Sequence, residues 1–301
     1  MGSGLNKCIT SLENMQLFKP DPRREVLVVN KNIVSIAGII LLVFVLETQG
    51  IDTGVKEGDE AQLPIDGLKV MTMEGDRDRG EDYVVTAAWR FTEKGHVRHT
   101  MKYTEKRKYY GGKDDLLFKS AVRYTAPPNI QSRSFLLWNY KDRERALWYY
   151  VLGMSAAQRT TNLELIRSLA ETDFNLAEYY DVNLGEEKHQ LLRSEACEDT
   201  TCYVVEGIPI KKQFPYGKRI IWIDQEELIP LKIEYYDKTG VLWKLLTITL
   251  KNRDGVWFWK KAVVENLQSD NKTYIAIEDV KLNTGLKDRD FTRGVLQQQN
   301  F

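Results

Sequence analysis

The stretch that decides the fold is residues 231–266, LKIEYYDKTGVLWKLLTITLKNRDGVWFWKKAVVEN. Apolar and polar side chains alternate through it with a period of two, which is typical of β-strands with one buried face. Two short polar segments divide it, Asp237–Gly240 and Asn252–Gly255, and each ends in a glycine that tolerates the positive φ of a hairpin turn. The stretch therefore predicts three antiparallel strands: Leu231–Tyr235, Val241–Leu250 and Val256–Asn266.

The same alternation extends in both directions along the chain. It predicts further strands over Tyr83–Phe91, His99–Lys106, Leu116–Tyr124, Ser134–Tyr140, Ala146–Leu152, Tyr203–Glu206, Arg219–Asp224 and Tyr274–Val280. Strands in hairpin succession form an antiparallel meander. Roughly ten or eleven strands without a linker indicate one continuous, strongly curved sheet. The period of the apolar pattern is two from Leu68 onward, so the β region is predicted to start there. One helix is predicted, Asn162–Ala170, with an apolar stripe on one face.

Composition and motifs argue against several classes of protein. Among the 301 residues, Lys+Arg and Asp+Glu are both 43, so the basic surface of a nucleic-acid-binding protein is not expected. The chain has no G-x-S-x-G, H-E-x-x-H, Walker or G-x-G-x-x-G motif, and three histidines offer little material for a metal site. Asp114 and Asp115 lie in a charged loop, where carboxylates are normally solvated. We therefore expect a protein that is not an enzyme and needs no cofactor or metal.

The N-terminal region carries one apolar segment. Ile33–Leu46 contains fourteen residues without a charge, whereas a membrane-spanning helix needs about 20 and a signal-peptide core about 7–15. Basic residues precede it, and the small residues Thr48 and Gly50 follow it. Residues 1–50 are therefore predicted to be a signal peptide with a long basic region, cleaved after Gly50, leaving residues 51–301 as the exported domain in the periplasm. The alternatives are an uncleaved anchor that tethers the domain to the inner membrane, and a buried core helix.

Cleavage after Gly50 would remove Cys8 and leave two cysteines in the exported domain. Cys197 and Cys202 flank a short polar segment that resembles a hairpin turn. An oxidising compartment favours their pairing, and a disulfide closing so small a loop stabilises by about 2 kcal/mol. We predict a structural disulfide; unpaired thiols are the alternative, and redox chemistry is disfavoured because the C-x-x-C spacing is absent.

Large aromatic residues gather on shared strand faces. Trp138 with Tyr140, Trp148 with Tyr150, and Trp257 with Trp259 each occupy alternate positions of one strand, which would form a broad apolar wall. That wall is either the ordinary core of a β-sandwich or barrel, or the lining of a concavity that receives an acyl chain. For the second interpretation the predicted cleft residues are Phe118, Val122, Trp138, Tyr140, Trp148, Tyr150, Trp222, Trp243, Trp257 and Trp259.

A basic segment, Lys102–Lys108, alternates charged and aromatic side chains. In an exported protein of neutral net charge, this pattern favours an exposed strand edge, which lysines protect from aggregation. Contact with anionic lipid headgroups is the alternative.

Several short motifs, taken in order, resemble the outer-membrane lipoprotein-sorting protein family, the LolA-like periplasmic carriers. They are Ala126–Ile130, Ala146–Leu152 followed by Arg159, Thr172–Leu176, Tyr216–Asp224, Leu231–Gly240, and Phe291–Thr292 followed by Leu296. The resemblance covers roughly Leu68–Leu296. It implies a mainly β fold: a single curved antiparallel sheet that forms an incomplete, half-open β-barrel with an apolar concave face and a short helical plug. Only Ile51–Gly67, interrupted by Pro64, is available for the family's opening helix, so the helical lid is expected to be incomplete.

The resemblance also implies a function. Members of the family hold lipoprotein acyl chains, so the expected role is a lipid or lipoprotein carrier in outer-membrane trafficking. Its expected partners are an acyl chain, an inner-membrane lipid exporter as donor and an outer-membrane acceptor. The alternatives are a non-catalytic structural or interaction domain of the cell envelope, and a hydrolase with a dispersed site.

Overall fold

A computed structural model describes residues 66–298 apart from 132, 161–171, 181 and 213. All of them belong to one compact unit, Glu60–Phe301. The signal-peptide segment, its boundary with the exported domain and the predicted helix Asn162–Ala170 lie outside the described residues and stay predictions. Within the described part, no helix has both the length and the apolar character needed to cross a membrane.

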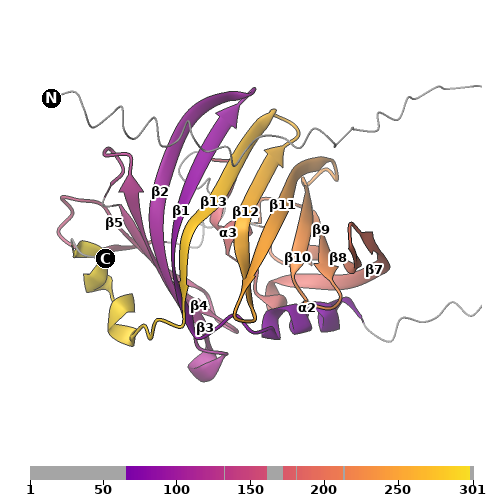
Figure 1. Ribbon diagram of the computed structural model, residues 1–301, viewed down its shortest axis with the longest axis horizontal. Coiled ribbons are helices and arrows are strands. Elements are labelled where there is room, and N and C mark those ends of the chain that lie inside the picture. Colours follow the sequence, from indigo (N-terminus) through magenta and orange to yellow (C-terminus); the bar gives the residue numbers. More distant parts are fainter. Residues whose placement is uncertain (1–65, 132, 161–171, 181, 213, 299–301) are drawn as a thin grey trace, which may run out of the picture. The chain divides into compact units, whose positions relative to one another are not determined.

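A single antiparallel sheet of thirteen strands dominates the structure (Figure 1). Its spatial order is β6-β5-β4-β3-β2-β1-β13-β12-β11-β10-β9-β8-β7, so the chain runs outward from β1 to one edge and returns from the other edge to pair β13 with β1. The two edge strands, β6 and β7, do not pair, and the sheet is therefore not closed into a barrel. The predicted fold class is confirmed.

The strands have the following bounds: β1 Asp82–Glu93, β2 His96–Tyr109, β3 Leu116–Ala126, β4 Ser134–Tyr140, β5 Ala146–Tyr150, β6 Gln158–Thr160, β7 Glu187–Cys197, β8 Thr200–Pro209, β9 Lys218–Asp224, β10 Pro230–Tyr236, β11 Leu242–Arg253, β12 Val256–Asn266 and β13 Asn271–Leu282. The two hairpin turns predicted within residues 231–266 are present, and Gly240 and Gly255 adopt φ values of +85° and +84°. Sequence analysis missed β6 and β7. In β7 a register shift between Leu191 and Arg193 breaks the alternation, and most of the strand is polar and solvent-exposed.

The basic segment Lys102–Lys108 is not a sheet edge, which corrects the sequence prediction. It lies in β2, which pairs with β1 on one side and β3 on the other. Its lysines point to one face while Glu105 and Arg107 point to the other and are buried. Charged residues on the buried face of a central strand are rare, and period-two alternation by itself does not reveal them.

Two helices accompany the sheet: α2 Gly67–Asp76 and α3 Leu176–Tyr179. Sequence analysis placed the start of the β region at Leu68, which is wrong. Asp66 caps α2 by accepting a hydrogen bond from the Lys69 amide at 2.7 Å, a local signal for a helix start. Gly67 lets this helix approach β7 closely, because a Cβ there would lie 2.5 Å from the backbone carbon of Gln190. α2 packs against β7 and β8; residues 51–65 lie outside the described residues, so the incomplete lid stays a prediction.

Short 3₁₀ helices complete the described structure: η2 Lys113–Asp115, η5 Leu184–Glu186, η6 Asp288–Phe291 and η7 Arg293–Gln297. The last two cover one face of the sheet beside β3, β4 and β5, as the yellow C-terminal segment in Figure 1 shows. Phe291 and Leu296 are fully buried there against Ala121 and Leu136. The C-terminal segment therefore covers this face over β3, β4 and β5.

The opposite face of the sheet packs around α3. Tyr180 stacks near Phe118 of β3 with ring centroids 6.0 Å apart, and Tyr179 meets Trp259 of β12 at 6.1 Å. Four strand intervals separate β3 from β12, roughly 19 Å in a flat sheet at about 4.8 Å per strand. Two adjacent residues contact both strands only because the sheet curls around them. The α3 segment thus forms the helical plug of the curved face.

Candidate functional site

A cavity lies between the α3 plug and the curved face of the sheet. The cavity has a volume of about 140 Å³, close to the roughly 150 Å³ of an engineered apolar cavity that binds benzene. Its apolar wall comes from β1 and β10–β13: Val85, Ile233, Leu246, Ile248, Val256, Trp257, Phe258, Trp259, Ile277, Val280 and Leu282, with Pro230. The interior of the curved sheet is therefore not completely filled by its own side chains.

Of the ten residues predicted to line a cleft, Trp257 and Trp259 line this cavity and the other eight do not. Phe118 is buried in the main core beside the plug, and Val122 packs against that core. Trp243 is half-buried, with the Lys244 ammonium 3.9 Å from its ring centroid.

The remaining five predicted residues pack in separate clusters. Trp138, Trp148 and Tyr150 pack with the C-terminal segment; Tyr140 packs with Leu116 and Ala146; Trp222 packs with Cys202, Val204 and Ile220. The pairing of aromatic residues on shared faces is real, since the rings of Trp138 and Trp148 meet at 5.3 Å. The alternation does not say which face turns toward the plug, because a shift of one residue exchanges the two faces.

A buried polar network under the plug was not predicted. Glu105 is fully buried and accepts hydrogen bonds from Arg107 at 2.8 and 3.0 Å, from Ser120 at 2.7 Å and from the Tyr179 hydroxyl at 2.9 Å. Tyr179 in turn meets the Tyr103 hydroxyl at 2.6 Å. The network ties the plug to β2 and β3. Within it, the carboxylate of Glu105 accepts four hydrogen bonds.

A second polar contact ties the plug to β11. Lys244 donates to the Glu178 carboxylate at 2.9 and 3.1 Å and to the Asp173 carbonyl at 2.5 Å. Both charged side chains are almost inaccessible to solvent, 4% exposed for Lys244 and 1% for Glu178. Burial raises the pKa of Glu178, and the Lys244 charge partly offsets that rise. The plug is thus held by polar contacts to β2, β3 and β11.

A third buried pair lies at the β7–β9 side of the cavity. Arg219 of β9 donates to Oε2 of Glu187 at 2.7 and 3.0 Å and to Oε1 at 3.1 Å, and the Tyr216 hydroxyl donates to Oε1 at 2.9 Å. Burial by itself would raise the pKa of Glu187, but the Arg219 charge and these hydrogen bonds outweigh it and lower the pKa to about 2. Glu187 is therefore a permanent anion at neutral pH.

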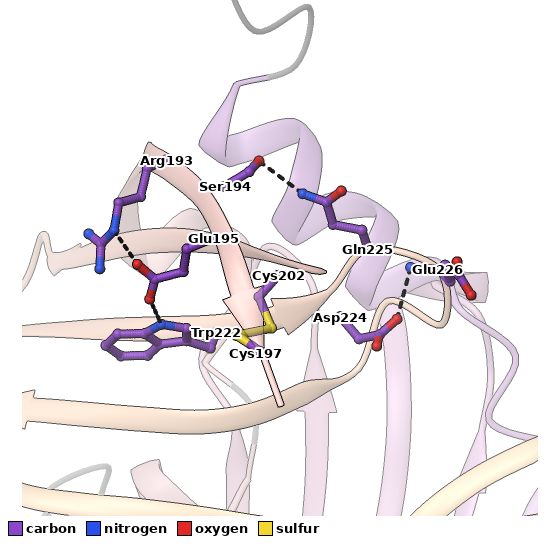
Figure 2. Close-up of a disulfide and its surroundings, with 9 residues drawn as sticks. All are labelled: Arg193, Ser194, Glu195, Cys197, Cys202, Trp222, Asp224, Gln225 and Glu226. Carbon is purple, nitrogen blue, oxygen red and sulfur yellow. Dashed lines mark hydrogen bonds and ion pairs between the residues drawn. A yellow bond between two sulfur atoms is a disulfide. The ribbon is translucent and has the colours of Figure 1, made fainter. Parts of the chain in front are cut away.

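The two cysteines form a disulfide at the tip of the β7–β8 hairpin, with their Cα atoms 5.9 Å apart (Figure 2). Figure 2 also shows Trp222 donating to Glu195, which Arg193 contacts at 2.6 Å. The disulfide joins an edge strand to its neighbour, far along the sheet from the α3 plug. Among the described residues no three His, Cys, Asp or Glu side chains gather as a metal site would require.

Comparison with solved structures defines the class of fold. An outer membrane lipoprotein-sorting protein domain from Vibrio parahaemolyticus is 23% identical, with a TM-score of 0.71 over 77% of this chain and 98% of its own. A DUF1329 family protein from Desulfovibrio piger is 22% identical, with a TM-score of 0.70 and coverages of 77% and 98%. A LolA superfamily protein from Nitrosomonas europaea is 23% identical, with a TM-score of 0.61 and coverages of 77% and 99%. The chain therefore has the LolA-like fold of lipoprotein-sorting domains, and the predicted resemblance is confirmed at the level of the fold.

A family model described as an uncharacterized protein matches residues 117–298, which is more than half of the chain. The chain belongs to that family. A comparison with curated proteins finds no match.

Proposed function

We propose that the protein is a non-enzymatic periplasmic carrier that holds an acyl chain of a lipid or lipoprotein in the cavity between the plug and the curved sheet. The observation that carries the proposal is this cavity, whose wall is formed mainly by aliphatic and aromatic side chains of β1 and β10–β13. Burial of an acyl chain there stabilises by about 0.8 kcal/mol per methylene group, so binding needs no catalytic residue.

The fold supports the same role. A structure named for lipoprotein sorting shares this fold and covers 77% of the chain. A carrier needs only different affinities for its ligand in different states to accept and release it. An inner-membrane exporter as donor and an outer-membrane acceptor are the partners that this role requires, and residues 1–50 would serve as the export signal.

The test compares two tryptophan substitutions on β13. Ile277→Trp adds bulk to a residue that lines the cavity, whereas Lys281→Trp adds the same side chain at an exposed position of the same strand. Lipid that co-purifies with the chain is identified by native mass spectrometry, and uptake of a labelled fatty acid is measured for each variant. We expect the wild type and Lys281→Trp to take up lipid, and Ile277→Trp to lose most of the uptake while it keeps its thermal stability. A lipid-free wild type that takes up no label would contradict the proposal and favour a structural or interaction domain.

A further inference from the structure

We infer that the ligand of this cavity is an anionic amphiphile, an acyl chain whose headgroup is a carboxylate or phosphate oxyanion. This inference rests on the proposed function and specifies its ligand class. Four arginines line the cavity among the described residues, Arg77, Arg79, Arg107 and Arg219, together with two carboxylates, Glu105 and Glu178; outside the lining, Glu187 pairs with Arg219, and Glu74 with Arg77 and Arg79. Cationic side chains on a low-dielectric wall attract anions more strongly than they would in water.

Hydrogen-bonding capacity points to the same ligand class. The two lining carboxylates already accept hydrogen bonds from their own partners, Glu105 from Arg107, Ser120 and Tyr179, and Glu178 from Lys244. The other polar side chains of the described lining are arginine, tyrosine and tryptophan, which offer N–H or O–H donors. A donor-rich wall suits a headgroup made of acceptor oxygens, and it suits a quaternary ammonium or a neutral polyol less well.

Arg107 is the donor best placed within the cavity wall. Its Nε and Nη2 atoms donate to Glu105, while Nη1 donates to no described residue. The guanidinium lies over the rings of Phe118 and Tyr180, at 4.6 and 4.9 Å from their centroids, which fixes its orientation. An oriented guanidinium with a remaining N–H group costs little to reorganise when an oxyanion arrives.

Arg77 and Arg79 place two further charges on the wall, in the segment that joins α2 to β1. Both contact the Glu74 carboxylate, at 3.3 and 2.9 Å, and their side chains are 17% and 15% exposed. A headgroup held at this segment would leave its acyl chain along the apolar wall. The two arginines are also near the surface, so they are the positions to substitute.

The experiment measures the affinities of four twelve-carbon probes by isothermal titration calorimetry, each below its micelle concentration: dodecanoate, dodecyl phosphate, monolauroylglycerol and dodecyltrimethylammonium. A charge-assisted hydrogen bond is worth about 1.5–3 kcal/mol, so we expect one or both anionic probes to bind at least about tenfold more tightly than the neutral probe. The cationic probe should bind most weakly. The ratio between dodecanoate and dodecyl phosphate then distinguishes a carboxylate from a phosphate headgroup.

The double variant Arg77→Gln/Arg79→Gln should lose most of the preference for anionic probes and keep the affinity for monolauroylglycerol. The matched control is Arg98→Gln/Arg143→Gln, which removes the same charge from side chains that are 58% and 59% exposed and do not line the cavity. It should bind like the wild type. Equal binding of anionic and neutral probes by the wild type overturns this inference and leaves the proposed function standing. Absence of binding by all four probes overturns both.

Discussion

Replacing Lys244 by methionine should destabilise the protein and loosen its plug. The substitution leaves the Glu178 carboxylate buried without its cation, and it removes the donor to the Asp173 carbonyl. Glu178 is 1% exposed, so bulk solvent compensates poorly for the lost ammonium group. Breaking one side of a buried ion pair costs about 3–5 kcal/mol, and we expect a loss of that size in the free energy of unfolding at pH 7.

The loss of stability in Lys244→Met should depend on pH, and the burial of Glu178 determines whether the loss grows or shrinks as the pH rises. Burial already raises the pKa of Glu178 in the wild type, and removing Lys244 takes away the charge that opposes the rise. A group whose pKa is higher in the folded state favours folding below its unfolded-state pKa, and that contribution is lost as the pH rises through the folded-state pKa. The deficit of Lys244→Met relative to wild type should therefore be small near pH 4 and grow toward neutral pH.

Urea denaturation followed by tryptophan fluorescence measures this prediction across that pH range. The double variant Lys244→Met/Glu178→Gln should recover much of the stability at pH 7, because it buries no charge and glutamine still completes the capping box of α3. The control is Lys272→Met, which breaks an ion pair with Glu265 whose side chains are 38% and 34% exposed and should cost no more than about 1 kcal/mol. A cost for Lys244→Met as small as that of the control, or one independent of pH, would refute the reasoning.

Three further predictions separate stability from binding. Cys197→Ser/Cys202→Ser should lower the free energy of unfolding by about 2 kcal/mol without changing lipid uptake, measured by urea denaturation; an unchanged stability would show that the small loop is ordered without the bond. Trp138→Ala should cost about 3 kcal/mol and leave ligand affinity unchanged, whereas Trp259→Ala should weaken ligand binding; a reversed pattern in calorimetry would place the ligand on the other face of the sheet. Burial raises the pKa of Asp82, but hydrogen bonds from the Thr284 side chain and three backbone amides outweigh this effect and hold the pKa below its ordinary value. The stability that Asp82 contributes is therefore present above its unfolded-state pKa and is lost as the pH falls through its folded-state pKa. Asp82→Asn should be less stable at pH 7 by about 1–3 kcal/mol, with a deficit that shrinks in acid urea titrations and not in alkaline ones.

Local sequence was sufficient for most of the strands. Alternation and turn glycines predict both ends of β12, and they predict the ends of β10 to within one residue and those of β11 to within three, because period two and positive φ are properties of single chain segments. The same signals fail at β7, where a bulge interrupts the pattern, and at α2, whose Asp66 cap is a short signal beside a long β pattern.

Tertiary structure alone decided which face of the sheet holds the cavity. Trp138 and Trp259 are equivalent in the alternating pattern, yet one packs under the C-terminal segment and the other lines the cavity. The polar contacts of the plug were visible in the sequence only as anomalies: Glu105 shares the parity of Met101 and Tyr103, and Lys244 shares that of Leu246 and Ile248. Their partners in the plug, Tyr179 and Glu178, lie 74 and 66 residues away, and pairing across such distances follows from how the sheet curls, which no local pattern encodes.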